Sequence, residues 1–328
     1  MTRPRLGFLG VGWIGRNRME AVARSGDAEV VCVADPDLEA AEAAAGAVGC
    51  TQIFGSLDDL LDRDLDGIVI ATPSALHAEQ CMAALESGVA VFCQKPLART
   101  AAEAAAVVEA ARAKNLLLGV DMSYRYVEAF RAAAAVVHEQ MRGSLYAIEL
   151  RFDNAYGPDK AWFLDPRLSG GGCVIDLGTH LIDVARWFTG EDAAVSAARL
   201  YRRGVRLDLP SQDAEDRAIV DLDAGGCHVR VECSWFLPIG VDARIVCRAY
   251  APDQSVEVVN VGGSFYDFAA YHHTRGGSTE LAAPPDAWGG RAVCAWTEAL
   301  GRREGFDPRV EDQVAIARAI DAIYGRQP

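Results

Sequence analysis

Asp176 and His180 lie four residues apart in a segment whose pattern predicts a helix over residues 173–188. This spacing puts both side chains on one helix face, and a histidine with a carboxylate neighbour is a workable general base near neutral pH. The glycines at 170–172 are expected to let a substrate or cofactor approach the backbone. The competing interpretation is a first-turn helix carboxylate and a histidine packed in the core. Metal binding is disfavoured, because no third ligand follows at a diagnostic spacing.

A glycine-rich segment follows the first apolar run and opens a helical pattern; it reads Gly10-Val11-Gly12-Trp13-Ile14-Gly15. Its first glycine suits a tight turn, the second leaves room for a pyrophosphate, and the third lets the helix pack closely on the strand. Asp35 ends the next apolar run, 20 residues after the last of these glycines. A carboxylate there accepts hydrogen bonds from ribose hydroxyls and repels a 2′-phosphate. We therefore expect NAD rather than NADP, with Arg16 offsetting part of the preference; the alternative is a turn that binds nothing.

Lys95 follows the apolar run 89–93 within the tripeptide Gln94-Lys95-Pro96. Ligands of open parallel sheets lie at the carboxyl ends of the strands, so this lysine is expected to reach the nicotinamide region. Its ammonium group can polarise a substrate oxygen there, and the proline fixes the backbone beside it. The competing interpretation is a surface lysine at the end of a strand.

Two kinds of segment alternate over the first part of the chain. Apolar runs predict strands at 6–9, 30–34, 67–71, 89–93 and 116–120, and helical spacing predicts helices at 14–25, 38–47, 57–61, 75–87 and 101–114. Such alternation predicts βαβ units in a doubly wound parallel sheet with helices on both faces. We expect this first domain to span residues 1–121.

The regular alternation of predicted strands and helices ends after Asp121. Helices are predicted at 127–141, 173–188, 291–300 and 310–324, and strands at 145–152, 195–201, 218–222, 228–235, 243–250 and 255–259. Consecutive strands joined by short loops predict an antiparallel sheet. Residues 122–328 are therefore expected to form a second α/β domain.

The composition restricts the class of protein. The chain has 328 residues, of which 51% are hydrophobic and 24% charged, as expected for two globular domains. A net charge of −14 argues against nucleic acid and anionic membranes as partners. The nine cysteines form no C-x-x-C pair and lie mostly in apolar runs, which predicts buried thiols in a reducing compartment. No apolar run is long enough to span a membrane, so a soluble cytoplasmic protein is expected.

In this order the motifs resemble those of the Gfo/Idh/MocA oxidoreductases, named for glucose–fructose oxidoreductase, inositol dehydrogenase and a rhizopine-catabolism protein. The residues that carry the resemblance extend over essentially the whole chain: Gly10, Gly12, Gly15, Ala34-Asp35, Ala71-Thr72-Pro73, His77, Lys95-Pro96, Gly170-Gly171-Gly172, Asp176 and His180. The resemblance implies a Rossmann domain followed by an α/β domain with an open, mostly antiparallel sheet. It also implies a nicotinamide bound between the domains and assembly into homodimers or homotetramers, often through that sheet.

The resemblance implies roles for single residues. Lys95 is expected to contact the substrate hydroxyl and the cofactor ribose, His180 to accept the proton, and Asp176 to position the substrate or His180. The residues expected to line the cofactor are Gly10, Gly12, Trp13, Ile14, Gly15, Asp35, Thr72, Pro73, Gln94 and Lys95, with His77 either there or structural at a helix start.

Gln94 departs from the family pattern, which usually has Glu at this position. A neutral amide can still hydrogen-bond a ribose hydroxyl, but it cannot pair ionically with Lys95, so cofactor affinity is expected to differ from that of relatives. The additional candidates for substrate contact, each with packing or a surface role as the alternative, are Tyr124, Arg125, Tyr156 and Trp162, followed by Lys160, Trp235, His272 and His273.

The expected reaction is reversible hydride transfer between nicotinamide and a secondary alcohol of a sugar, amino-sugar or cyclitol, without a metal. Lys95 would stabilise the substrate oxygen and His180 would take its proton. Three alternatives stay open: redox-neutral cleavage of a glycoside through transient NAD oxidation, reduction of a non-sugar substrate, and an NAD-binding regulator.

Overall fold

The computed structural model of the chain describes residues 3–326, and these divide into two compact units. The first unit comprises the chain up to Ala98, then Ala102–Ser123 and Gly289–Val314. The second comprises Arg99–Ala101, Tyr124–Trp288 and the chain from Ala315 onward. The two units thus differ from a single division at residue 121, because the segment 289–314 returns to the first unit.

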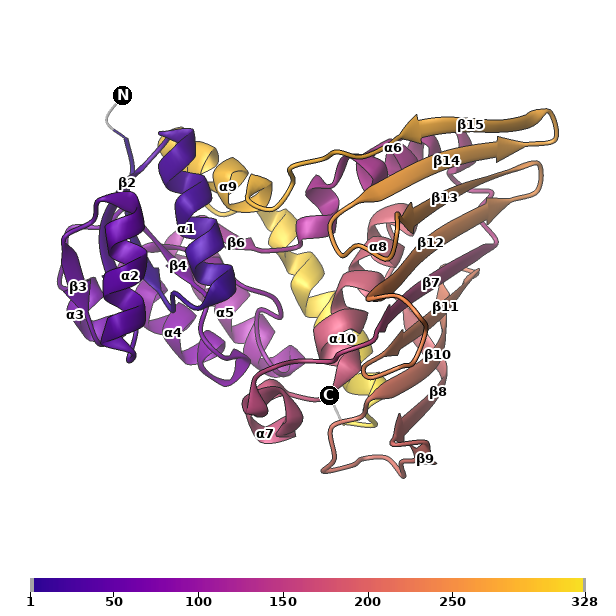
Figure 1. Cartoon of the computed structure of the whole chain (residues 1–328), viewed down its shortest axis with the longest axis horizontal. Coiled ribbons are helices and arrows are strands. Elements are labelled where there is room, and N and C mark those ends of the chain that lie inside the picture. The colour runs from indigo at the N-terminus through magenta and orange to yellow at the C-terminus, as the bar shows by residue number, and fades with distance from the viewer. Residues whose placement is uncertain (1–2, 327–328) are drawn as a thin grey trace. The chain divides into compact units, whose positions relative to one another are not determined.

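The first unit holds a six-stranded, wholly parallel sheet in the order β3-β2-β1-β4-β5-β6 (Figure 1). Its strands are β1 (Arg5–Leu9), β2 (Glu29–Ala34), β3 (Gln52–Phe54), β4 (Gly67–Ile70), β5 (Ala90–Cys93) and β6 (Leu118–Val120). Its helices are α1 (Trp13–Ser25), α2 (Leu38–Val48), α3 (Leu57–Leu61), α4 (Ser74–Glu86), α5 (Ala101–Lys114), α9 (Arg291–Gly301) and the short η5 (Pro308–Glu311). The predicted doubly wound sheet is confirmed, and the strand order changes direction between β1 and β4, where such folds bind nucleotides.

Helix α9 joins the first unit through one large side chain. A Cβ atom at Gly67 or at Gly119 would lie 2.6 Å from the Trp296 ring, so the two glycines leave the space that the indole fills. The ring also packs on Phe92, with 5.7 Å between centroids. These contacts explain why a helix that the sequence assigned to the second domain lies against the first sheet.

The second unit holds a nine-stranded sheet in the order β15-β14-β13-β12-β7-β11-β10-β8-β9. Its strands are β7 (Ala147–Asn154), β8 (Ala194–Arg202), β9 (Val205–Arg206), β10 (Arg217–Ala224), β11 (Cys227–Ser234), β12 (Ala243–Ala251), β13 (Gln254–Asn260), β14 (Phe268–Thr274) and β15 (Gly277–Ala282). All neighbours are antiparallel except β7 and β11, so the predicted sheet is confirmed as mostly antiparallel. His272 and His273 lie on β14, where the sequence predicted a loop.

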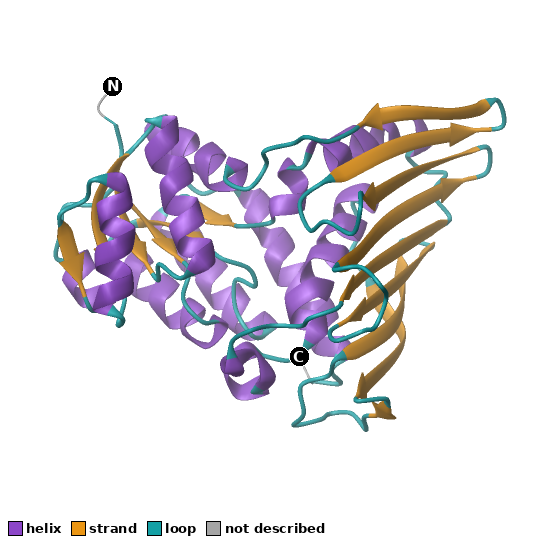
Figure 2. Ribbon diagram, in the orientation of Figure 1, coloured by secondary structure: helices purple, strands orange, loops and turns teal. Residues whose placement is uncertain are grey.

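Helices cover one face of this sheet (Figure 2). Contacts run from α6 to β13, β14 and β15, and from α8 to β7, β10 and β11. The helical segments of this unit are η1 (Ser123–Tyr126), α6 (Glu128–Val136), η2 (Val137–Met141), η3 (Ala161–Leu164), α7 (Pro166–Ser169), η4 (Val174–Gly178), α8 (Thr179–Thr189) and α10 (Asp312–Ile323), with the starts of η1 and α10 in the first unit. The strands bury alternate residues against the helices, as β11 and β12 show most clearly. Between residues 3 and 326, no helix is long and apolar enough to cross a membrane.

Candidate active site

The glycine-rich turn between β1 and α1 has the geometry that its sequence predicts. Gly10 has φ +81°, and a Cβ atom there would lie 2.7 Å from the Ala71 carbonyl oxygen. A Cβ atom at Gly15 would overlap the carbonyl oxygen of Gly10. Both positions therefore require glycine for the turn and for close packing of helix on strand.

Gly12 differs from these two glycines, because a Cβ atom there would have no neighbour within 4 Å among the described residues. It caps α1, whose start receives no side-chain hydrogen bond from the described part of the chain and whose first turn holds no acidic residue. Exposed N–H groups at a helix N-terminus attract anions through their partial positive charge. This open cradle fits the pyrophosphate of a dinucleotide.

A substitution at Gly12 tests dinucleotide binding separately from the stability of the fold. Gly12→Ala is expected to raise the dinucleotide Kd about tenfold or more and to leave Tm within about 2 °C of the wild type, since the methyl group enters only the space where a pyrophosphate would approach. Calorimetric titration with NAD and NADP, together with thermal unfolding, measures both effects. Gly46→Ala on α2, where a Cβ atom also meets open space, is the matched control. Wild-type affinity in Gly12→Ala would show that no phosphate binds at this turn.

Asp35 follows β2 and lies against the same turn. One carboxylate oxygen accepts a hydrogen bond from the Val11 N–H and the other from the Asp37 N–H, both at 2.9 Å. Each oxygen retains a second lone pair for a hydroxyl donor. Arg16, the residue expected to offset this carboxylate, pairs with Glu20 on its own helix at 2.8 Å.

His77 connects the two loops that carry the other predicted cofactor residues. Its Nδ1 lies 2.7 Å from the Pro96 carbonyl oxygen and its Nε2 lies 2.8 Å from the Thr72 carbonyl oxygen. The ring is 1% exposed. Burial lowers the pKa of His77, while the two carbonyls act in the opposite direction. His77 is thus a buried clamp between the loop of Thr72-Pro73 and that of Lys95-Pro96, while Lys95 itself is half-buried.

The side-chain amide of Gln94 is directed at Asp121. Its Nε2 donates to a carboxylate oxygen of Asp121 at 2.6 Å, and both side chains are buried. The same oxygen accepts from Nε of Arg18 at 2.6 Å. The amide at position 94 therefore belongs to a buried polar cluster of the first unit.

In the second unit, Asp176 and His180 converge on the Tyr124 ring. The rings of Tyr124 and His180 stack with 4.9 Å between centroids. Burial raises the pKa of the Tyr124 hydroxyl and the nearby charge of Asp176 raises it further, so Tyr124 stays protonated at neutral pH. Nε1 of Trp235 donates to Asp176 at 3.1 Å. Both Asp176 and His180 are partly exposed, whereas Tyr124 is 4% exposed and lies in a supporting position.

Aromatic side chains continue from Trp235 into the loop after β7. Phe163 meets Trp235 edge to face, and Trp162 stacks on Phe163 with 3.8 Å between centroids. An aromatic row beside a carboxylate and an imidazole suits a sugar ring, which offers apolar faces and hydroxyl edges. Trp162 is thus connected to Asp176 through Phe163 and Trp235.

The other predicted substrate residues make contacts within the protein. Arg125 forms a bidentate ion pair with Asp183 of α8, the closest contact being 2.7 Å. The hydroxyl of Tyr156 donates to Asp242, and the Tyr156 ring is exposed. Lys160 is exposed and pairs with its neighbour Asp159 at 3.7 Å. Arg125 therefore holds the helix that carries His180, and Tyr156 is fixed at the end of the sheet.

Protein atoms occupy the space where side chains would lie at two of the three glycines of the segment 170–172. A Cβ atom at Gly172 would overlap the backbone of Glu215, and one at Gly171 would overlap the Tyr324 hydroxyl. Glu215 is fully buried and accepts hydrogen bonds from the N–H groups of Gly172 and Val174 at 3.0 and 2.8 Å. The Tyr324 hydroxyl donates to it at 2.8 Å. Protein atoms fill the space beside these glycines and anchor the start of the helical segment of Asp176 and His180.

Several of these partners were not anticipated from the sequence: Arg18, Asp121, Asp183, Glu215, Asp242 and Tyr324. Asp183 had a local signal, since Asp176, His180 and Asp183 follow the i, i+4, i+7 spacing of one helix face. Glu215 and Tyr324 had none, because they lie 43 and 152 residues from Gly172 along the chain.

Comparison with known proteins agrees with the fold and the motifs. Residues 5–122 match the family model described as an oxidoreductase family with an NAD-binding Rossmann fold, and residues 130–271 match the GFO/IDH/MocA C-terminal domain. A protein named D-xylose 1-dehydrogenase (NADP(+)) 2 from Haloferax volcanii is 30% identical over 97% of this chain and 95% of its own length. Inositol 2-dehydrogenase 4 from Saccharopolyspora erythraea is 28% identical over 96% of this chain and 86% of its own.

Solved structures share the fold over nearly the whole chain. A 3-ketoreductase from Actinomadura kijaniata, in complex with NADP and TDP-benzene, has a TM-score of 0.84 at 20% identity and covers 98% of this chain and 97% of its own. A levoglucosan dehydrogenase in complex with NADH and L-sorbose has the same TM-score at 22% identity, with 98% and 96% covered. With its motifs, both sheets and both family models in agreement, the chain belongs to the Gfo/Idh/MocA oxidoreductase family.

Proposed function

We propose that the protein interconverts a secondary alcohol and a ketone on a sugar, amino-sugar or cyclitol, with a dinucleotide held at the glycine-rich turn. The observation that carries the proposal is the stacking of His180 on the buried Tyr124 ring beside Asp176, whose carboxylate accepts a hydrogen bond from Trp235. The relatives named for D-xylose, inositol and levoglucosan support the class of substrate. A bound nicotinamide would supply the carbon that accepts or donates hydride.

In this proposal the protein handles the oxygen and the proton. His180 accepts the hydroxyl proton when the alcohol is oxidised and returns it in the opposite direction, since its ring is held by stacking on Tyr124. The ammonium group of Lys95 stabilises the developing alkoxide. Asp176, oriented by Trp235, positions the substrate or the imidazole. Trp162 and Phe163 offer aromatic faces to the sugar.

We propose NAD as the preferred cofactor. The carboxylate of Asp35 faces the turn that would hold the pyrophosphate, and Arg16 is engaged with Glu20. A 2′-phosphate would therefore meet a negative charge without a free guanidinium from this helix. The relative from Haloferax volcanii is named for NADP, so the cofactor needs a direct test in this chain.

A single absorbance screen tests reaction and cofactor together. Purified protein is mixed with NAD or NADP and a panel of sugars, glycosides, amino-sugars and inositols. The expected result is steady formation of reduced cofactor with at least one of them, and a kcat/KM at least about tenfold higher with NAD. Equal or greater kcat/KM with NADP would overturn the role given to Asp35 and leave the reaction class intact.

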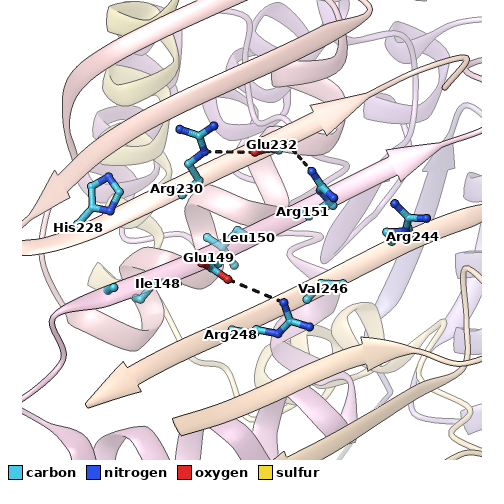
Figure 3. A pocket seen from close by; sticks show the side chains of 11 residues that line it. Ile148, Glu149, Leu150, Arg151, His228, Arg230, Glu232, Arg244, Val246 and Arg248 are labelled. Carbon is cyan, nitrogen blue, oxygen red and sulfur yellow. Dashed lines mark hydrogen bonds and ion pairs between the residues drawn. The ribbon is translucent and has the colours of Figure 1, made fainter. Parts of the chain in front are cut away.

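We also propose a homodimer or homotetramer that forms through the face of the nine-stranded sheet not covered by α6 and α8. That face bears a concavity of about 490 Å³ across β7, β11 and β12 (Figure 3). Figure 3 shows Arg151 and Arg230 directed at Glu232, and Arg248 directed at Glu149. A face with both signs of charge can be complementary to a second copy of itself.

Arg244 provides the test of this assembly. It is exposed in the concavity and has no ion-pair partner among residues 3–326. Light scattering is expected to give the mass of a dimer or tetramer for the wild type and a smaller assembly for Arg244→Glu, because reversing a charge in a self-complementary face disturbs the charge matching at each symmetry-related contact. Arg24→Glu on α1 is the control. A monomeric wild type would overturn the assembly.

A further inference from the structure

The polar cluster behind Lys95 contains one cation, one anion and one neutral amide. Arg18 on α1, Asp121 after β6 and Gln94 after β5 are 5%, 1% and 8% exposed. Both Arg18 and Gln94 donate to the same oxygen of Asp121, each at 2.6 Å. Arg18 also donates to Asn17 at 2.7 Å and to the carbonyl of Gly289. These contacts tie the helix after the glycine-rich turn to the ends of two neighbouring strands.

The cluster fixes the backbone that carries Lys95. The N–H of Gln94 donates to Ile70 and the N–H of Asp121 donates to Cys93, so both strand ends are held in register. The side chain of Gln94 anchors the residue before Lys95, and His77 holds the carbonyl of the residue after it. Lys95 therefore projects from a short segment that is tied on both sides by buried polar groups.

We infer that Asp121 and Arg18 are positioning residues for Lys95, and that position 94 must be neutral because Asp121 already supplies the single carboxylate that Arg18 balances. The inference rests on the proposed function for the role of Lys95. It assigns a physical reason to Gln94: a glutamate there would place a second carboxylate against Asp121 with no additional cation. Two carboxylates in contact cannot both ionise without a large cost.

No other basic side chain is seen to contact Asp121 in the part of the chain that the structure describes. The groups that face Asp121 are Arg18 from α1, Gln94 from β5 and the thiol of Cys93. The pKa of that thiol is raised by burial, by Cys81 of α4 and by the charge of Asp121. Lys95 is the residue that follows Gln94 in the sequence. The second oxygen of Asp121 is buried and has no hydrogen-bond partner among residues 3–326, so the one carboxylate of the cluster is itself incompletely satisfied before a second is added.

The test moves the negative charge from position 121 to position 94. Gln94→Glu is expected to lower kcat about tenfold or more at pH 8 and by less than about threefold at pH 6, where the two carboxylates share a proton. Asp121→Asn leaves Arg18 buried without its carboxylate and is expected to lower Tm on the order of 10 °C. The double variant Gln94→Glu/Asp121→Asn restores one anion and is expected to recover kcat to within about threefold at both pH values. Gln94→Met removes the amide without adding charge and controls for the lost hydrogen bond.

A positioning role requires that kcat changes more than the KM for the dinucleotide, and that the exchange rescues it. Wild-type kcat in Gln94→Glu at pH 8, or a double variant no better than the sum of its parts, would overturn the inference. Thermal unfolding of the same four variants at pH 6 and pH 8 needs no substrate. If no substrate is turned over by the wild type, the proposed function fails, while the charge matching of positions 94 and 121 is still tested by Tm.

Discussion

Replacing Lys95 by Met is expected to lower kcat by about 10³-fold, and replacing His180 by Ala by about 10²- to 10⁴-fold. In the proposed mechanism, the first change removes the cation that would stabilise the substrate oxygen, and the second removes the group that would accept the proton. Both changes leave the glycine-rich turn intact, so both variants are expected to bind NAD. The Kd is expected to stay within about threefold of the wild type for His180→Ala and to rise by no more than about tenfold for Lys95→Met, which also loses the expected contact with the cofactor ribose. Steady-state kinetics and calorimetric titration on the same preparations measure the two effects separately.

The control for the lysine is Lys114→Met, which removes an exposed ammonium group near the end of α5. It is expected to alter neither kcat nor cofactor affinity. A Lys95→Met protein that binds NAD and keeps wild-type kcat would contradict the mechanism proposed above. A protein that fails to bind NAD would instead place Lys95 mainly in cofactor binding.

The second large effect concerns Glu215 and the stability of the second unit. Glu215→Ala removes the acceptor for Gly172, Val174 and Tyr324, all of them buried at this contact. Buried donors left without acceptors are costly, so the variant is expected to lose at least about 3 kcal/mol in the free energy of unfolding at pH 6. Urea unfolding measures it. As control, Glu280→Ala removes an exposed carboxylate from β15 and is expected to change stability by less than about 0.5 kcal/mol.

Glu215 also makes the free energy of unfolding depend on pH. Burial raises the pKa of its carboxyl to about 7, whereas the unfolded value is 4.5. Between these values the folded state holds more protons than the unfolded state, so this group's contribution to stability is fully present below the unfolded pKa and is lost as pH rises through the folded pKa. Relative to Glu215→Gln, the wild type is therefore expected to lose on the order of 2–3 kcal/mol in the free energy of unfolding between pH 5 and pH 8. Parallel curves for the two proteins would show that Glu215 titrates normally.

The parallel sheet and its cofactor turn could be predicted because their signals are local. Five of the six strands of the first sheet were predicted from apolar runs, and Gly10, Gly12 and Gly15 lie at a fixed spacing after the first of them. Strand β3 was missed because it has three residues and little burial. Strands β14 and β15 were missed because β15 is largely exposed and the polar end of β14 reads as a loop.

The supports of the candidate site could not be predicted, because they depend on contacts between residues far apart in sequence. Gly171 and Gly172 look like room for a ligand until Glu215 and Tyr324 are seen to fill it. Likewise, nothing near Gln94 in the sequence indicates that its side-chain amide donates a hydrogen bond to Asp121. The candidate site residues could be named from the sequence, whereas the groups that hold them became apparent only from the fold.

The most direct test of the central claim is the stoichiometry of reduced cofactor to product for the first substrate that the screen identifies. We expect one molecule of NADH for each molecule of ketone formed, and loss of both in Lys95→Met and His180→Ala. Product formation without accumulation of NADH would contradict it and would indicate redox-neutral cleavage of a glycosidic bond.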